Sequence, residues 1–168
     1  VLAASHDELG SLALQAEPGA GGVVLVPYFE GERTPNLPQA TAELVGLTLS
    51  NNTRANIARA AIEGMLCGLN AGLDALVAAG VDCSRIFLVG GAAANPAVQQ
   101  IAAEIFGVPL VVPQPGEYVA MGAARQAADV LLGSAPKWET STLASLTSSR
   151  ADHVIQAYKK AADFAAKR

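Results

Sequence analysis

The sequence predicts an α/β domain in which helices pack against a mixed sheet. Short apolar runs typical of buried strands alternate with longer stretches whose apolar residues recur at helical spacing. The segment 86–112, IFLVGGAAANPAVQQIAAEIFGVPLVV, shows both patterns in the order strand, glycine turn, helix, strand. The chain has 168 residues, 51% of them hydrophobic and 15% charged. This length and composition suit a single domain, 1–168, with a core of its own.

The first third of the chain contains apolar runs separated by loops. Its patterns predict, in order, a helix over 1–17, a loop over 19–22, a strand over Val23–Val26, an extended loop over Pro27–Pro38, and a segment, Leu44–Leu49, that begins with a helical turn. The continuous apolar run Val23–Val26 is typical of a strand buried on both faces.

The longest helical pattern covers Ala55–Val77 and ends at Gly80. Its apolar stripe is expected to consist of Ile57, Ala61, Met65, Leu69, Leu73, Leu76 and Val77. Three glycines recur every four residues on an adjacent line: Gly64, Gly68 and Gly72. Because each interior glycine costs about 0.5–1 kcal/mol relative to alanine, three in register predict that another backbone packs closely against this helix.

The segment 86–112 is the most informative part of the chain. Asn95 is a good helix cap and Pro96 suits the first helical position. The expected buried stripe of this helix is Val98, Ile101, Ala102, Ile105 and Phe106. Before it, the glycine pair at 90–91 either forms a tight turn or lets a ligand approach the backbone, and the residues alone leave both interpretations open.

Two familiar phosphate-binding patterns are missing from this turn. The sequence G-G-A-A-A-N does not match the G-x-G-x-x-G fingerprint, which disfavours a Rossmann-type oxidoreductase, and it does not match a Walker A loop. The rest of the chain predicts a loop over 113–116, a helix from Glu117 or Tyr118 to about Leu132, an irregular segment over 133–149, and an amphipathic helix over 151–166.

Composition and charge exclude several classes of function. The net charge of −4 argues against nucleic acid as a partner. We expect no transmembrane helix, because long apolar runs are interrupted by charges, and no signal peptide, because the first residues lack a basic segment. Cys67 and Cys83 lack metal or redox spacing, so they are interpreted as reduced, mostly buried thiols of a cytoplasmic protein.

Three segments, in this order, resemble motifs of the FGGY family of carbohydrate kinases, most closely those of its xylulokinases. The first is Pro27–Pro35, PYFEGERTP. The second is Ala42–Leu47 followed by Asn56–Glu63, which is similar to the second signature of the family. The third is the turn G-G-A-A-A-N with the later Gly122–Ala124, which resembles the adenosine-contacting turn and a following helix. The resemblance is strongest over 23–132.

The resemblance implies two actin-like, ribonuclease-H-like domains with a cleft between them. By this resemblance the chain would be most of the C-terminal domain, without its opening hairpins, and would bind ATP or ADP. The N-terminal domain, outside this chain, would hold D-xylulose or a related sugar, and most ligands of Mg²⁺ would also lie outside. The resemblance leaves a homodimer open.

The family's catalytic aspartate lies in a glycine-rich segment that this chain does not contain. The aspartates present, all on or beside expected helices, are Asp7, Asp74, Asp82, Asp129, Asp152 and Asp163. We therefore expect no catalytic residue and no metal ligand in this chain, and no kinase activity from the chain alone.

The resemblance assigns cofactor binding to Gly90, Gly91, Ala92 and Asn95. The two glycines would lie against adenine and ribose, Ala92 occupies a position where many relatives have glycine, and Asn95 would both cap its helix and reach the adenine edge.

Three further residue groups keep two interpretations each. Gln99 either lines the same pocket or faces solvent. Glu32 and Arg33 either help to hold phosphate or the interdomain geometry near the cleft, or form a local ion pair that rigidifies the loop. Gly122–Ala124 either lets its helix pass close to the nucleotide or lets it pack closely against a neighbour.

The alternatives to a xylulokinase are of two kinds. One is a non-catalytic actin-like regulatory or scaffold domain whose glycine turn is empty. The other is an FGGY kinase for another sugar, such as gluconate or ribulose, because the sugar-binding half lies outside this chain.

Overall fold

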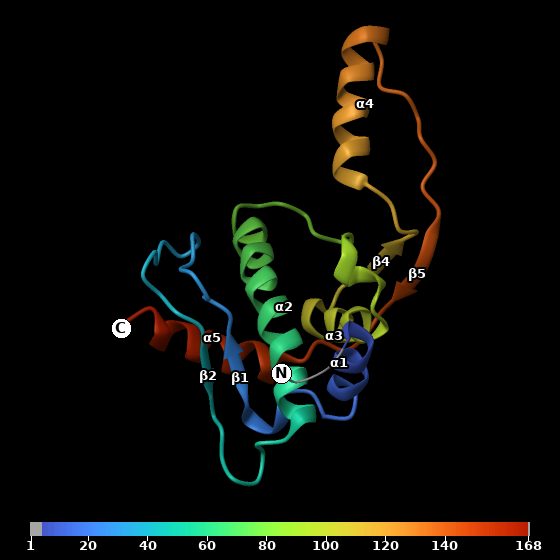
Figure 1. Cartoon of the computed structure of the whole chain (residues 1–168). Helices are drawn as coiled ribbons and strands as arrows, with labels where there is room; N and C mark the ends of the chain where they lie inside the picture. The colour runs from blue at the N-terminus through green and yellow to red at the C-terminus, as the bar shows by residue number, and fades with distance from the viewer. Residues whose placement is uncertain (1–4, 168) are drawn as a thin grey trace.

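The computed structural model describes residues 5–167 and confirms a mixed α/β arrangement (Figure 1). The helices are α1 (His6–Ala13), α2 (Arg54–Ala78), α3 (Pro96–Phe106), α4 (Tyr118–Leu132) and α5 (Asp152–Ala165), with short 3-10 turns η1 (Ala20–Gly22) and η2 (Gly91–Ala94). The expected helix over 1–17 is therefore shorter, and its first four positions lie outside the described residues.

The strands form two small sheets. They are β1 (Val24–Val26), β2 (Glu43–Val45), β3 (Ile86–Phe87), β4 (Leu110–Pro113) and β5 (Thr142–Leu146). The first pair is antiparallel, whereas β4 lies between a parallel β3 and an antiparallel β5. Because β3 and β4 are parallel, their carboxyl ends meet at one edge, beside the glycine turn.

Two of these strands contradict the sequence expectations. The expected helical turn at Leu44–Leu49 is wrong, because β2 pairs there with β1 and places Val45 opposite Val24. The segment 133–149, expected to be irregular, contains β5, in which Leu146 lies opposite Leu110. In both cases pairing with a strand distant in sequence overrides a weak local preference.

Helix α3 lies at the centre of the larger hydrophobic core. All five residues of its expected stripe are buried, as predicted. Helices α1, α2 and α5 contribute the other large part of this core, including Ala13, Leu66 and Ile155. The core therefore fixes the start of α3, and with it the glycine turn that precedes this helix.

The buried face of α2 differs from the expected stripe. Met65, Leu69 and Leu76 are 39%, 58% and 53% exposed. The buried side chains instead include three polar or charged residues, Arg59, Glu63 and Asn70, beside apolar residues such as Ile62, Leu66 and Cys67. The prediction counted apolar residues only, whereas Arg59 and Glu63 are buried because they pair with each other.

The glycine line on α2 makes one close backbone contact. A Cβ on Gly64 would lie 2.2 Å from the carbonyl oxygen of Leu25 in β1, so the predicted close approach is correct there. At Gly68 the nearest atom is the Tyr158 hydroxyl, 3.4 Å from a Cβ, and around Gly72 there is open space among the described residues. The close backbone contact along this line is therefore confined to Gly64.

Helix α2 is also long and apolar enough to cross a membrane, judged by length and composition alone. Its N-terminal half packs against α1, α3 and β1 and contains the buried pair Arg59 and Glu63. The N-terminal half of this helix is therefore part of the protein core.

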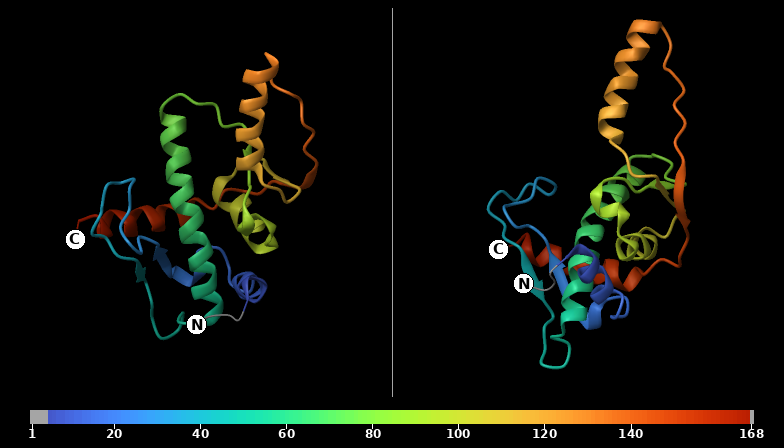
Figure 2. Two further views of the ribbon diagram at one scale, coloured as in Figure 1. Left: turned by 45° about the horizontal axis from the view of Figure 1, so that its top comes forward. Right: turned by 45° about the vertical axis from the view of Figure 1, so that its right-hand side comes forward.

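Helix α4 projects away from the rest of the chain (Figure 2). Each of its residues is at least partly exposed, and Val119 and Val130 are both 88% exposed. A Cβ on Gly122 would meet nothing within 4 Å among the described residues, so these residues supply no packing partner at this glycine. Arg125 links the helix to the following segment by donating to the carbonyl of Pro136 at 2.9 Å.

Helix α5 covers β1 and holds the loop that follows this strand. On its apolar face Val154, Ile155, Tyr158 and Ala165 are buried, while Ala161 and Ala162 are half-buried. Burial raises the pKa of the Tyr28 hydroxyl, which is hydrogen-bonded to Tyr158. Both cysteines are free thiols, Cys67 buried and Cys83 half-buried.

Candidate nucleotide site

The glycine turn joins the end of β3 to the start of α3. Gly90 has φ +105° and ψ 172°, a conformation that only glycine adopts readily. The turn is closed by two backbone hydrogen bonds of 3.1 Å, from Ala93 N to Gly90 O and from Asn95 N to Ala92 O. Gly90 is therefore required by the turn itself, with or without a ligand.

Asn95 caps α3 as predicted. Its Oδ1 accepts a hydrogen bond from Ala97 N at 2.9 Å, and Pro96 occupies the first turn of the helix. The same side chain also reaches α1, because its Nδ2 donates to the carbonyl oxygen of His6 at 2.9 Å. This second contact joins residues that are 89 positions apart, so no local pattern in the sequence indicates it.

Gln99 has a role that neither sequence interpretation included. It is buried, and its Nε2 donates to the carbonyl oxygen of Ala93 at 2.8 Å. The side chain therefore braces the turn from the first turn of α3. The signal for this role in the sequence is the position of Gln99 four residues after the helix cap, because a side chain at that position lies next to the preceding turn.

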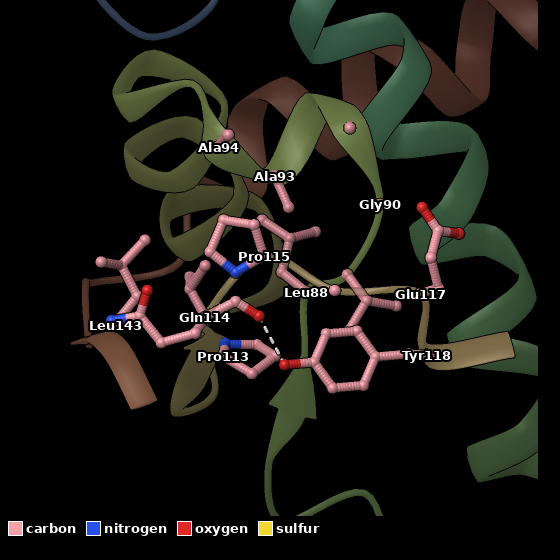
Figure 3. A pocket seen from close by; sticks show the side chains of 14 residues that line it. Leu88, Gly90, Ala93, Ala94, Pro113, Gln114, Pro115, Glu117, Tyr118 and Leu143 are labelled. Atoms are coloured by element: carbon pink, nitrogen blue, oxygen red, sulfur yellow. Dashed lines mark hydrogen bonds between the residues drawn. The ribbon is translucent and has the colours of Figure 1, made fainter. Parts of the chain in front are cut away.

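Two cavities lie on either side of this turn. The first, here called the strand-end cavity, has a volume of about 250 Å³ and lies at the carboxyl ends of β3 and β4 (Figure 3). Its walls include Leu88, Gly90 and Ala93 on one side and the loop 113–118 on the other, with Leu143 from β5. Tyr118 closes the loop by donating its hydroxyl proton to the carbonyl of Gln114.

The second, here called the helix-side cavity, lies between α1, α2 and the turn and has a volume of about 620 Å³. Its lining residues are His6, Asp7, Leu9, Ala61, Ile62, Met65, Gly91, Ala92, Ala94, Asn95 and Val98. This size lies within the range of small-molecule sites, roughly 300–1,000 Å³. Its walls are mostly apolar, with polar groups at His6, Asp7 and Asn95.

The structure gathers the four residues assigned to cofactor binding around these cavities. Gly91 lines both, Gly90 lines the strand-end cavity, and Ala92 and Asn95 line the helix-side cavity. A Cβ on Gly90 or Gly91 would meet nothing within 4 Å among the described residues. Gly91 also has no positive φ, so at this position neither a strained backbone nor a close neighbour accounts for the missing side chain.

The acidic residues are distributed rather than clustered. Asp7 lines the helix-side cavity and Glu117 the strand-end cavity. Asp74 lies at the far end of α2, where its hydrogen bond from Lys159 lowers the pKa of its carboxyl group. Among residues 5–167, groups of three or more side chains that could hold a metal ion are absent. Backbone amides, carbonyls and apolar walls thus dominate the chemistry of both cavities.

The loop that carries the PYFEGERTP motif lies outside the walls of both cavities. Glu32 Oε1 accepts the backbone N–H groups of Arg33 at 2.7 Å and Thr34 at 3.2 Å. The structure gives no ion pair between the Glu32 and Arg33 side chains in its described part. Glu32 rigidifies the loop through backbone contacts, so the expected ion pair is wrong while its expected effect is retained.

Comparison with known proteins agrees with the motifs. Residues 2–129 match the model of the FGGY family of carbohydrate kinases, C-terminal domain. A xylulose kinase of Haemophilus influenzae is 41% identical over 121 residues, 72% of this chain and 24% of the relative. A glycerol kinase of Methylibium petroleiphilum is 42% identical over 123 residues, 70% of this chain and 24% of the relative.

The fold agrees as well. The crystal structure of xylulose kinase from Bifidobacterium adolescentis superposes with a TM-score of 0.81 and 46% identity, covering 94% of this chain and 32% of that one. The chain spans about a quarter of the length of the curated relatives it matches. It belongs to the FGGY family of carbohydrate kinases, with the actin-like fold expected of the C-terminal domain of that family.

Proposed function

We propose that this chain is the ATP-binding C-terminal portion of a kinase that transfers a phosphoryl group from ATP to D-xylulose. The single observation that supports nucleotide binding most strongly is the unoccupied space at Gly91. An alanine would fit there without strain, yet the chain has a glycine between two cavities. A planar base and ribose approaching the backbone would use this space.

The helix-side cavity is the better site for the base. Three of the four residues assigned to the cofactor line it, and its walls are mostly apolar. The Nδ2 of Asn95 donates one of its two protons to His6, so a second proton is left for the edge of an adenine. Gly90 and Gly91 would then lie against the ribose, and the phosphates would extend beyond the residues of this chain.

The groups that move the phosphate are assigned to the remainder of the protein. Phosphoryl transfer needs a group that orients the hydroxyl, donors for the γ-phosphate and Mg²⁺. Groups of three or more His, Cys, Asp or Glu side chains that could hold a metal ion are absent from the described range 5–167, so most ligands of Mg²⁺ would lie in the remainder of the protein. A homodimer, if one forms, and the proposed cytoplasmic location would be properties of the whole protein rather than of this chain alone.

Titration of the chain with ADP, followed by NMR, tests nucleotide binding. We expect the amide signals of Gly90, Gly91 and Asn95 to shift at millimolar ADP. The variant Gly91→Leu should abolish these shifts without loss of folding, because its side chain would occupy the open space. Gly72→Leu is the matched control, since Gly72 also lies in open space but away from both cavities.

If wild-type chain shows no shifts at millimolar ADP, the nucleotide role is wrong, and a non-catalytic actin-like domain becomes the better interpretation. With ATP, Mg²⁺ and D-xylulose, the chain alone should show no turnover, and steady turnover would contradict the assignment of catalysis elsewhere. The identity of the sugar is tested on a protein that includes the N-terminal domain, by comparing D-xylulose with ribulose, gluconate and glycerol as substrates.

A further inference from the structure

Gly10 lies in the middle of α1, where a glycine is unfavourable. The helix has eight residues and Gly10 is buried within it. In a helix interior, glycine is about 1 kcal/mol less favourable than alanine. Its backbone conformation is ordinary, because its φ is not positive, so the local fold of α1 does not require glycine at this position.

The space beside Gly10 is filled by the side-chain amide of Asn95. A Cβ on Gly10 would lie 2.5 Å from Oδ1 and 2.8 Å from Nδ2 of Asn95. Real Cβ atoms do not approach other atoms this closely, so alanine at position 10 would force the amide or the helix to move. Gly10 therefore permits α1 to lie directly against the side chain of Asn95.

The amide that Gly10 accommodates is held at both ends. Oδ1 of Asn95 accepts from Ala97 N and Nδ2 donates to His6 O, each at 2.9 Å. Rotating the side chain to escape a new Cβ would break one or both bonds. Breaking the first uncaps α3, and breaking the second releases α1 from the turn.

Helix α1 is also a wall of the helix-side cavity. It supplies His6, Asp7 and Leu9 to the lining, opposite Ala92 and Asn95. The contact between Gly10 and Asn95 determines how far α1 lies from the turn, and with it the width of this cavity.

We propose that Gly10 is a positioning residue for the nucleotide site: it fixes the orientation of the Asn95 amide and the distance between α1 and the glycine turn. This inference rests on the proposed function, because it assigns to Gly10 an effect on the same ligand. It adds α1, which none of the sequence motifs includes, to the elements that determine nucleotide affinity.

The test is a double-mutant cycle in ADP affinity, measured by NMR titration of the folded chain. Gly10→Ala should weaken ADP binding about five- to tenfold, the effect of losing one well-placed hydrogen bond. It should also shift the side-chain amide signal of Asn95 before ADP is added. Gly72→Ala, a helix glycine in open space, should change neither quantity.

The second arm of the cycle uses Asn95→Ser. Serine still caps a helix, but it is shorter and lacks the Nδ2 donor, so it leaves room for a Cβ at position 10. Asn95→Ser itself should weaken ADP binding. Gly10→Ala should then cause no further loss, because the contact through which it acts is gone.

The outcomes separate this inference from the proposed function. If wild type binds ADP and Gly10→Ala binds equally well, or if the two losses multiply independently, Gly10 does not act through Asn95 and the inference is wrong while the proposed function stands. If wild type does not bind ADP, both are wrong. If Gly10→Ala does not fold, the double variant with Asn95→Ser should restore folding, and failure to restore it would refute the contact.

Discussion

The most severe single substitution is expected at Arg59, where α2 meets α3 and the segment after α1. Its guanidinium is 2% exposed and has three partners. Nε donates to Glu63 Oε1 at 2.7 Å, Nη1 donates to the carbonyl oxygen of Ala16 at 3.0 Å, and Nη2 donates to Glu104. Glu63 in turn accepts the N–H of Gly19 at 2.9 Å. One cation thus joins three segments of the chain.

Arg59→Met keeps the length and the apolar stem of the side chain but removes the charge. Two buried or nearly buried carboxylates, Glu63 and Glu104, then face each other without a cation, and the Ala16 carbonyl loses its donor. Breaking a buried ion pair from one side costs about 3–5 kcal/mol. Total stabilities of domains are about 5–15 kcal/mol, so the variant should lose a large part of its free energy of unfolding.

Urea unfolding followed by far-ultraviolet circular dichroism measures this loss. With a slope of about 1–3 kcal/mol per molar urea, the midpoint should fall by about 2 M. The matched control is Lys159→Met, which removes the more exposed pair with Asp74, 2.8 Å apart. That change should cost less than about 1 kcal/mol. If Arg59→Met lost no more than Lys159→Met, the charge cluster would not hold the segments together.

The pH dependence gives a second check on the same cluster. Burial raises the pKa of Glu63 above its usual value of 4.5, although its hydrogen bonds with Gly19 and Arg59 oppose this. A carboxyl group whose pKa is raised by folding reduces stability as the pH rises from the unfolded to the folded pKa. Without Arg59 less opposes the rise in the pKa of Glu63. The stability that Arg59→Met loses relative to wild type should therefore become smaller as the pH falls toward 4.5. A deficit that stays constant over this range would contradict the electrostatic explanation.

Three other predictions concern the packing of α2. Gly64→Ala should destabilise the chain by about 1–3 kcal/mol, because its Cβ would lie 2.2 Å from the Leu25 carbonyl oxygen, whereas Gly72→Ala should stabilise it by about 0.5–1 kcal/mol. Thermal unfolding of both variants tests this prediction, and equal effects would contradict the close packing at Gly64. Asn70 is buried, and neither its Oδ1 nor its Nδ2 has a hydrogen-bond partner among the described residues. Asn70→Ala should therefore leave the free energy of unfolding unchanged or raise it, and a loss above about 1 kcal/mol would mean that the amide is hydrogen-bonded in solution. Burial raises the pKa of the Cys67 thiol to about 12, so at pH 9 iodoacetamide should modify the half-buried Cys83 first, and rapid modification of Cys67 in the folded chain would refute its burial. The stability of the chain should also fall as the pH rises from about 9 to 12, because the thiol ionises in the unfolded chain before it ionises in the folded one.

Local patterns were sufficient wherever neighbouring residues set the structure. The cap at Asn95, the proline after it and the apolar stripe of α3 act within a few residues, so their sequence order determines where this helix begins and which face is buried. The α/β class follows from the same patterns, and the ordered motifs indicated the kinase family before any contact was known.

The tertiary structure alone decided the features that depend on partners distant in sequence. Strands β2 and β5 exist because they pair with β1 and β4, and α2 buries the charged Arg59 because this side chain pairs with Glu104 on another helix. The same holds at the glycine turn: the sequence pointed to Gly90, Gly91, Ala92 and Asn95, but the wall formed by α1 became visible only in three dimensions. A contact such as Gly10 with Asn95 leaves no periodic signal along the chain, because its energy depends on the distance between two helices rather than on the spacing of residues in either one.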